Sequence, residues 1–269
     1  MAVSEPDLDK ISASLGDAER TGEPTDPVRL AGPALTLDDA YAIQGRTRAR
    51  RLAAGERIVG HKIGLTSEAM QKQLGVDQPD FGFLTDAMVV ADGGSVDPSK
   101  LIAPRLEPEF AFRIDRALPV DPSLQETREA IGAVAVAIEI IDSRIANWDI
   151  ALVDTVADNA SSARLVSGPW RHVDQGVLED LPGTEVRLIC DGDVVASGLG
   201  SAVLGDPVTA VHWLARALGR YGEALREGEI ILAGAVSGAM PLTAGHEWTV
   251  SAPAFRSATF RTIREERKA

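Results

Sequence analysis

The chain has 269 residues, of which 45% are hydrophobic and 25% are charged, and its formal net charge is −13. This size suits one large domain, or one domain with a helical appendage. The acidic balance argues against a nucleic acid or an anionic membrane as the main partner, because both favour basic patches. A small anionic substrate is compatible with it, since one lysine or metal ion outweighs the global charge locally.

Cysteine content and hydropathy bear on the compartment. Cys190 is the single cysteine, so an intrachain disulfide is impossible and a reducing environment fits. The first twenty residues are polar and acidic, without the apolar segment of a signal peptide. No apolar run is long enough to span a bilayer. We therefore expect a soluble, cytoplasmic protein.

Two helices are predicted at the N-terminus. Apolar residues at three- and four-residue spacing predict the first, over about residues 5–20: Leu8, Ile11, Leu15 and Ala18. A connector rich in proline and glycine follows. Thr36 and Asp39 then resemble a capping box, which predicts a second helix that ends near residue 55, with its arginines on the solvated face. We expect residues 1–57 to form an N-terminal helical cap.

From about residue 58 onward, strand patterns predominate. Alternating or β-branched runs predict strands within residues 58–66, 87–96, 105–114, 133–145, 184–200, 228–236, 246–252 and 254–263. Asp191 and Gly192 mark a hairpin turn, and Asp206 caps one amphipathic helix. Strands thus outnumber helices, which favours an α+β fold with a mixed sheet closed into a roll or barrel. We expect residues 58–269 to form this second domain.

Three glutamates are candidate ligands of a metal ion. Glu107 and Glu109 are two apart in a predicted strand, so alternation points both carboxylates to one face. Glu139 lies in an apolar strand, where an ionised carboxylate is costly unless it is compensated. If the three converge, they offer an oxygen-rich site for a hard cation, Mg²⁺ or Mn²⁺. The alternative is that each faces solvent or pairs with an arginine such as Arg105 or Arg144.

Further polar residues have both a catalytic and a structural interpretation. Lys62 lies between an apolar strand and glycines, where desolvation would lower its pKa and suit it to proton transfer, although most lysines reach the surface. Asp80 follows a proline, and a role in a turn is favoured over a catalytic one. Asp158, Asn159 and Ser161 precede a strand and suit an Asx-type turn, or orient a substrate.

Several known site motifs are absent from the sequence. The four histidines show no zinc-binding spacing, and there is no P-loop, no GxSxG elbow and no GxGxxG fingerprint. Cys190 lies in an apolar strand, which favours a core role over that of a nucleophile.

A family resemblance rests on motifs that occur in order over about residues 36–251: GHKIGLTS, GVDQPDFGFL, PRLEPEF, IEIIDSRI, DTVADNASS and a long segment from GSAVLGDP to ILAG. Together they resemble the 2-keto-4-pentenoate (2-hydroxypenta-2,4-dienoate) hydratases and 4-oxalocrotonate decarboxylases of aromatic meta-cleavage pathways. These enzymes belong to the fumarylacetoacetate hydrolase superfamily. Where the family strand usually reads IEAE, this chain has Pro108, which removes a backbone donor and suggests an edge strand or a bulge.

The resemblance implies a set of site residues and a fold. The family's divalent metal is held by an E-x-E pair and a later glutamate, which match Glu107, Glu109 and Glu139. The family's catalytic lysine, loop acid and serine match Lys62, Asp80 and Ser161. The implied fold is a mixed β-roll with outer helices. The implied partners are further copies of the chain and a small 2-oxo or 2-hydroxy acid, and the resemblance also allows association with a pathway decarboxylase or aldolase.

The expected activity is that of a metal-dependent lyase. Within the family, an acid at the position of Asp80 is typical of hydratases, and an apolar residue there is typical of decarboxylases. We therefore expect hydration of 2-hydroxypenta-2,4-dienoate, or a close analogue, to a 4-hydroxy-2-oxo acid. The alternatives are a 4-oxalocrotonate decarboxylase and, in a different class, a non-catalytic partner subunit of such enzymes.

Overall fold

A computed structural model describes residues 4–31, 35–67, 71–72, 75–174 and 176–263. Its strands form two sheets. The larger has the order β2-β1-β11-β5-β6-β7-β3, with β12 beside β5 and β8 beside β6. Its strands are β1 (Ile58–Gly64), β2 (Asp80–Thr85), β3 (Val89–Val90), β5 (Arg105–Ile114), β6 (Ile131–Ile141), β7 (Ser162–Ser167), β8 (Arg171–His172), β11 (Ile230–Ala235) and β12 (Met240–Pro241).

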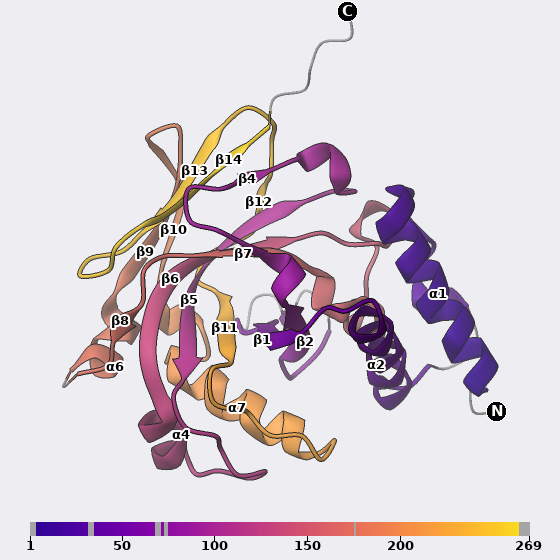
Figure 1. The fold of residues 1–269 in the computed structure, drawn as a ribbon, viewed down its shortest axis with the longest axis horizontal. Coiled ribbons are helices and arrows are strands. Elements are labelled where there is room, and N and C mark those ends of the chain that lie inside the picture. The colour runs from indigo at the N-terminus through magenta and orange to yellow at the C-terminus, as the bar shows by residue number, and fades with distance from the viewer. Residues whose placement is uncertain (1–3, 32–34, 68–70, 73–74, 175, 264–269) are drawn as a thin grey trace, which may run out of the picture.

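The smaller sheet has five strands in the order β10-β9-β13-β14-β4. They are β4 (Ser95–Val96), β9 (Glu185–Cys190), β10 (Asp193–Leu199), β13 (Glu247–Ser251) and β14 (Ala258–Thr262). Parallel and antiparallel pairs both occur in the larger sheet, which curls around the long β5–β6 hairpin (Figure 1). The expected α+β fold with a curled mixed sheet is confirmed.

The helices lie outside the sheets (Figure 1). They are α1 (Glu5–Thr21), α2 (Leu37–Ala53), α4 (Leu124–Ala130), α5 (Leu152–Ala157), α6 (Val177–Asp180) and α7 (Pro207–Gly219). Short 3₁₀ turns lie between the helices and strands: η1 (Val28–Leu30), η2 (Asp86–Met88), η3 (Pro98–Lys100), η4 (Ala146–Trp148), η5 (Asn159–Ser161), η6 (Leu181–Gly183) and η7 (Gly200–Ala202). No helix in the described ranges is long and apolar enough to cross a membrane.

The N-terminal helices follow the predicted pattern at their caps but not on their arginine face. Thr36 and Asp39 form the expected capping box at the start of α2. The expectation that the arginines of α2 face solvent is wrong for Arg46 and Arg51, which are half-buried. Arg46 pairs with acids of α1, and Arg51 pairs with Glu19 at 2.5 Å. Opposite charges therefore join the two helices, while their apolar stripes pack with α5 in one buried cluster.

Pro108 lies in the middle of the larger sheet, so the edge-strand interpretation is wrong; a register shift does occur nearby, but its extra residue is in β11, between Leu232 and Ala235. β5 pairs with β6 on one side and with β11 and β12 on the other. The Pro108 carbonyl accepts a hydrogen bond from Val236 N at 3.0 Å, on the side of β11. The nitrogen of a strand residue points to the same side as its carbonyl. The missing donor thus falls just beyond the end of β11, next to the register shift between β11 and β5.

Two other predicted elements are confirmed. β9 and β10 form the hairpin with its turn at Asp191 and Gly192. Asp206 caps α7 by accepting a hydrogen bond from Val208 N at 2.9 Å, and the apolar side of this helix is buried against the sheet.

Candidate active site

The three candidate glutamates come together on one face of the β5–β6 hairpin. Glu107 lies directly opposite Glu139 in the antiparallel register, and Glu109 is two residues further along β5. Alternation along each strand places their side chains on the same face. One carboxylate oxygen from each residue lies within 4.8 Å of the others. All three residues are buried.

Lys62 reaches this cluster from another part of the sheet. It lies on β1, which is separated from β6 by β11 and β5. Three strand spacings cover about 14 Å in a flat sheet, yet Lys62 Nζ lies 3.3 Å from Glu139 Oε2. The curl of the sheet therefore closes this gap. Lys62 Nζ also donates a hydrogen bond to the Ala160 carbonyl at 2.9 Å.

The acids of the cluster hold protons more tightly than ordinary carboxyl groups. Burial raises the pKa of Glu107 to about 7, against the attraction of Lys62. Burial and the neighbouring Glu139 raise the pKa of Glu109 well above its usual range. Burial also raises the pKa of Glu139, which Lys62 partly offsets. Three glutamates facing one ammonium thus leave uncompensated negative charge in a buried place.

The pKa of Lys62 departs from the sequence-based expectation. Burial acts to lower it, as expected, but Glu139, Glu107 and Asp80 raise it by more. The expectation of a lowered pKa is therefore wrong for the metal-free chain. Lys62 is an ammonium group whose charge the surrounding acids stabilise.

The donor set suits a hard divalent cation. Glu109 Oε1 and Glu139 Oε1 are buried and have no hydrogen-bond partner among the described residues. Buried carboxylate oxygens are costly in that state, and a cation that they ligate would satisfy them. The arginine alternative does not hold in the described part of the chain, where the ion pair of this cluster is with Lys62 and Arg144 pairs with Asp158 at 2.5 Å.

Gly234, near the end of β11, orients the carboxylate of Glu109. Its N–H donates to Glu109 Oε2 at 2.9 Å. Its φ of +110° lies in the region that favours glycine, and a Cβ there would lie 2.3 Å from Thr66 Oγ1. A side chain at this position would therefore strain the backbone that orients Glu109.

Asp80 is the first residue of β2, so its interpretation as a turn former is wrong. It pairs with Gly64 of β1 in register and is buried. Asp80 Oδ2 accepts a hydrogen bond from Thr155 Oγ1 at 3.3 Å, while Oδ1 has no hydrogen-bond partner among the described residues. Burial raises the pKa of Asp80, and Lys62 counteracts this. Burial and Lys62 thus act in opposite directions on the pKa of the Asp80 carboxyl group.

The segment from Asp158 to Ser161 is a strained turn, and its three polar candidates, Asp158, Asn159 and Ser161, have different partners. Asn159, Ala160 and Ser161 all have positive φ, between +49° and +55°, which is uncommon for residues with a Cβ. Asp158 binds Arg144 through its side chain, and Asn159 bonds both backbone groups of Phe83. Ser161 Oγ is buried with no hydrogen-bond partner in the described ranges. Asp158 and Asn159 therefore have structural roles. Of the three candidates, Ser161 is the one whose side chain is available to a ligand.

A cavity of 270 Å³ opens above these groups. Its lining includes Lys62, Asp80, Glu107 and Ser161, together with Arg105 and Trp148. The Arg105 guanidinium lies 4.4 Å from the centre of the Trp148 ring, and Trp148 Nε1 donates to the Ala103 carbonyl at 3.0 Å. Sequence reasoning treated Arg105 only as a neutralising partner. Its spacing of two from Glu107 places it on the same strand face and was a usable signal.

Buried acids and an enclosed lysine at a cavity, with shifted pKa values, are typical of an enzyme active site. The chain belongs to the fumarylacetoacetate hydrolase family: the model described as "Fumarylacetoacetate (FAA) hydrolase C-terminal" matches residues 55–262.

Individual members of the family are similar to the chain over most of its length. The chain is 45% identical over 229 residues to a 2-keto-4-pentenoate hydratase of Paraburkholderia xenovorans (strain LB400), covering 85% of this chain and 84% of the relative. It is 43% identical over 237 residues to a 2-hydroxyhexa-2,4-dienoate hydratase of Comamonas testosteroni, covering 86% and 88%. Among solved structures, the 4-oxalocrotonate decarboxylase from Pseudomonas putida G7, complexed with magnesium and adipate, superposes with a TM-score of 0.92 at 36% identity, covering 97% and 99%.

Proposed function

We propose that the chain is a metal-dependent hydro-lyase of aromatic meta-cleavage catabolism, which hydrates 2-hydroxypenta-2,4-dienoate or a close analogue to a 4-hydroxy-2-oxo acid. The observation that carries the proposal is the convergence of Glu107, Glu109 and Glu139 beside Lys62 at a cavity. The names of the hydratase relatives, at 43–45% identity, support the reaction class.

The three glutamates would hold the metal ion. All three donors are carboxylate oxygens, which favours Mg²⁺ or Mn²⁺ over softer cations. The magnesium in the similar decarboxylase structure supports a divalent ion. When bound, the cation would supply positive charge to the substrate oxygens and stabilise the negative charge that develops on the enolate.

The remaining candidates move protons. The dienol first gains a proton at C5 and loses one from its 2-hydroxyl, which yields the 2-oxo-3-enoate. Water then adds at C4, and a proton is delivered to C3. Lys62 and Asp80 lie on paired strands at the cavity and would transfer these protons. The free Ser161 hydroxyl would orient the substrate or the attacking water.

We propose that residues 1–57 form a cap that holds the backbone of the active site in place, and that residues 58–269 contain the catalytic residues. Gln44 of α2 donates to the carbonyls of Phe81 on β2 and Val156 on α5, at 3.0 and 2.9 Å. These two carbonyls flank Asp80 and the strained turn. We also propose a cytoplasmic homo-oligomer that can associate with a pathway decarboxylase or aldolase.

A 4-oxalocrotonate decarboxylase is the second candidate, and Arg105 favours it. In the described part of the chain, Arg105 forms no ion pair and stacks on Trp148 beside the cavity. A free guanidinium there can bind the second carboxylate of a dicarboxylic substrate. If it does, Arg105→Gln should raise KM for 2-oxohex-3-enedioate much more than for the monocarboxylic dienoate. Equal changes in both KM values would remove this support.

Product analysis tests the proposal directly. The purified chain is incubated with 2-hydroxypenta-2,4-dienoate and with 2-oxohex-3-enedioate, each with Mg²⁺ and with EDTA. We expect a 4-hydroxy-2-oxo acid from the first substrate, only when metal is present. Release of CO₂ from the second substrate alone would identify the decarboxylase. Inactivity toward both, restored by a partner protein, would identify a non-catalytic subunit.

A further inference from the structure

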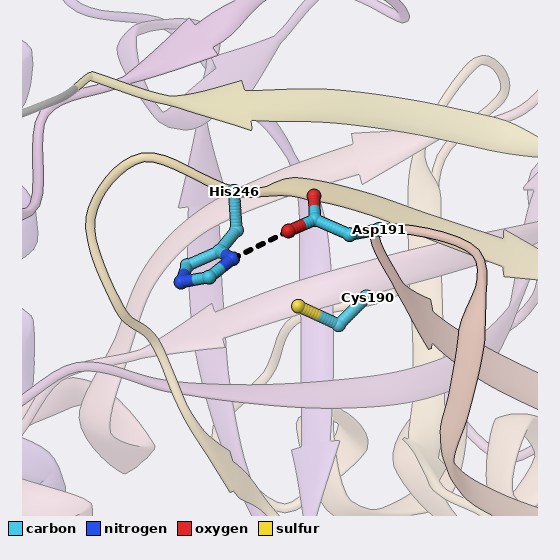
Figure 2. Close-up of side chains that lie close together, drawn as sticks. All are labelled: Cys190, Asp191 and His246. Carbon is cyan, nitrogen blue, oxygen red and sulfur yellow. Dashed lines mark hydrogen bonds and ion pairs between the residues drawn. The ribbon is translucent and has the colours of Figure 1, made fainter.

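A second group of possible metal ligands lies on the smaller sheet. Cys190 ends β9, Asp191 begins the turn of the β9–β10 hairpin, and His246 immediately precedes β13. Figure 2 shows the three side chains pointing toward one another from these two neighbouring segments. The cysteine sulfur, a carboxylate oxygen and an imidazole nitrogen all lie within 4.8 Å of one another. None of the three lines the cavity described above.

The backbone holds these residues in place. Asp191 N donates to the Glu247 carbonyl at 2.9 Å, and Glu247 N donates back to Asp191 Oδ1 at 2.8 Å. His246 N donates to Thr262 Oγ1 at 2.9 Å. Asp191 Oδ2 is left to face His246 Nδ1 at 2.7 Å. Such outer hydrogen bonds orient the ligand atoms before an ion arrives.

The surroundings of Cys190 do not favour a nucleophilic thiolate. Burial raises the pKa of the Cys190 thiol, and Asp191 and Asp193 raise it further. A reactive cysteine needs the opposite shift, toward the thiolate.

We propose that Cys190, Asp191 and His246 form a second metal site, which binds a borderline cation such as Zn²⁺ through one sulfur, one oxygen and one nitrogen and leaves a fourth position to water. Thiolate and imidazole ligands select Zn²⁺, whereas the all-oxygen glutamate cluster selects harder cations. On binding, the thiol proton leaves to solvent and the His246–Asp191 contact is exchanged for two bonds to the ion. Tetrahedral zinc separates its ligand atoms by about 3.3–3.8 Å, so small side-chain rotations suffice.

The site is accessible from solvent, because the side chains of His246 and Asp191 are 39% and 54% exposed. A bound ion would join the tip of the β9–β10 hairpin to the start of β13. It should therefore raise the thermal stability of the chain by binding the folded state. This inference does not depend on the proposed activity.

Cobalt spectroscopy tests the site in the full chain. The protein, saturated with Mg²⁺, is titrated anaerobically with Co²⁺ in a non-thiol reductant. We expect a thiolate-to-cobalt charge-transfer band that saturates at one equivalent and that Zn²⁺ abolishes. Co²⁺ at the glutamate cluster cannot give this band, because that cluster has no sulfur.

Two variants and a control complete the experiment. Cys190→Ser should lose the band, and His246→Gln should weaken binding by at least about 100-fold, as expected for loss of a direct ligand. Both should also lose the Zn²⁺-dependent rise in Tm. The exposed His172, on β8, provides the control His172→Gln, which should behave as the wild type. Absence of the band in the wild type, or unchanged affinity in the folded His246→Gln chain, would overturn the proposal.

Discussion

At the scale of single residues, the candidate active site contains more acidic groups than basic ones. Glu107, Glu109 and Glu139 face one ammonium group, that of Lys62. Asp80 adds a fourth acid nearby and raises the pKa of Lys62 together with the glutamates. A buried excess of negative charge opposes folding unless protons or a cation neutralise it. In the proposed metal site, the same excess would favour binding of a divalent ion.

Removal of one proposed ligand should abolish turnover without unfolding the chain. Glu107→Gln keeps the shape of the side chain but removes a charge, so we expect metal-dependent turnover to fall by at least about 100-fold. Circular dichroism should be unchanged. The exposed Glu227 provides the control Glu227→Gln, which should retain full activity. Full activity of a metal-stripped Glu107→Gln chain would contradict the assignment.

The stability of the metal-free chain should depend on pH. Burial raises the pKa of Glu107 from 4.5 to about 7, so the folded chain holds a proton that the unfolded chain has released in this window. Stability is then present below pH 4.5 and decreases as the pH rises toward 7. We expect Tm in EDTA to be lower at pH 8 than at pH 5. The control Glu227→Gln should show the same decrease as the wild type.

Added Mg²⁺ should remove most of this decrease, because the cation compensates the ionised carboxylates. Glu107→Gln should make the decrease in EDTA smaller, since one of the buried carboxyl groups with a raised pKa is gone. If Tm in EDTA instead increases steadily from pH 5 to pH 8, the negative charge of the glutamate cluster is already compensated without a metal ion, and the prediction is wrong.

At the scale of elements, the site depends on backbone features that local patterns do not specify. The turn η5 places three consecutive residues in the left-handed region and presents the Ala160 carbonyl to Lys62. Such strain persists only where the surroundings enforce it. Here the side chains of Asp158 and Asn159 supply that constraint through Arg144 and Phe83.

Gly234→Ala should destabilise the chain and disturb the site together. Its positive φ and the 2.3 Å approach of a Cβ to Thr66 Oγ1 predict a loss of about 1–3 kcal/mol in the free energy of unfolding. Gly183→Ala is the matched control, because a Cβ there meets nothing within 4 Å. Denaturant titration measures both. A loss for Gly234→Ala no larger than that of the control would contradict the assigned strain.

The sequence predicted some of these elements and missed others for physical reasons. Alternation was enough to place Glu107 and Glu109 on one face, because that rule is local. The contact of Lys62 with Glu139 depends on the curl of a sheet whose pairings span distant segments. Asp80 was assigned to a turn because a proline precedes it, but its pairing with Gly64 extends β2 to that residue. No local pattern predicts three left-handed residues without glycine.

At the scale of the whole molecule, β10 presents an unusual surface. It lies at the edge of the smaller sheet in the described part of the chain. Val194, Val195 and Leu199 on this strand are exposed. Exposed apolar edge strands tend to pair with another chain. This edge therefore supports the proposed homo-oligomer.

A charge on β10 should weaken that assembly. We expect Val194→Lys to shift the oligomer toward smaller species in light scattering coupled to gel filtration, because the edge would repel its partner. Val120→Lys is the control, since Val120 is similarly exposed but lies outside the sheets. Identical masses for both variants and the wild type would exclude this edge as the interface.

All three proposed metal ligands belong to one hairpin, formed by consecutive strands β5 and β6 within residues 105–141. Lys62 and Asp80, by contrast, are contributed by a different strand pair. The proposed metal ligands are therefore encoded by one contiguous segment, which gene recombination can transfer as a unit. A chimaera that receives this segment would inherit the three proposed ligands together, whereas the proposed proton transfer would depend on the lysine and acid of the recipient.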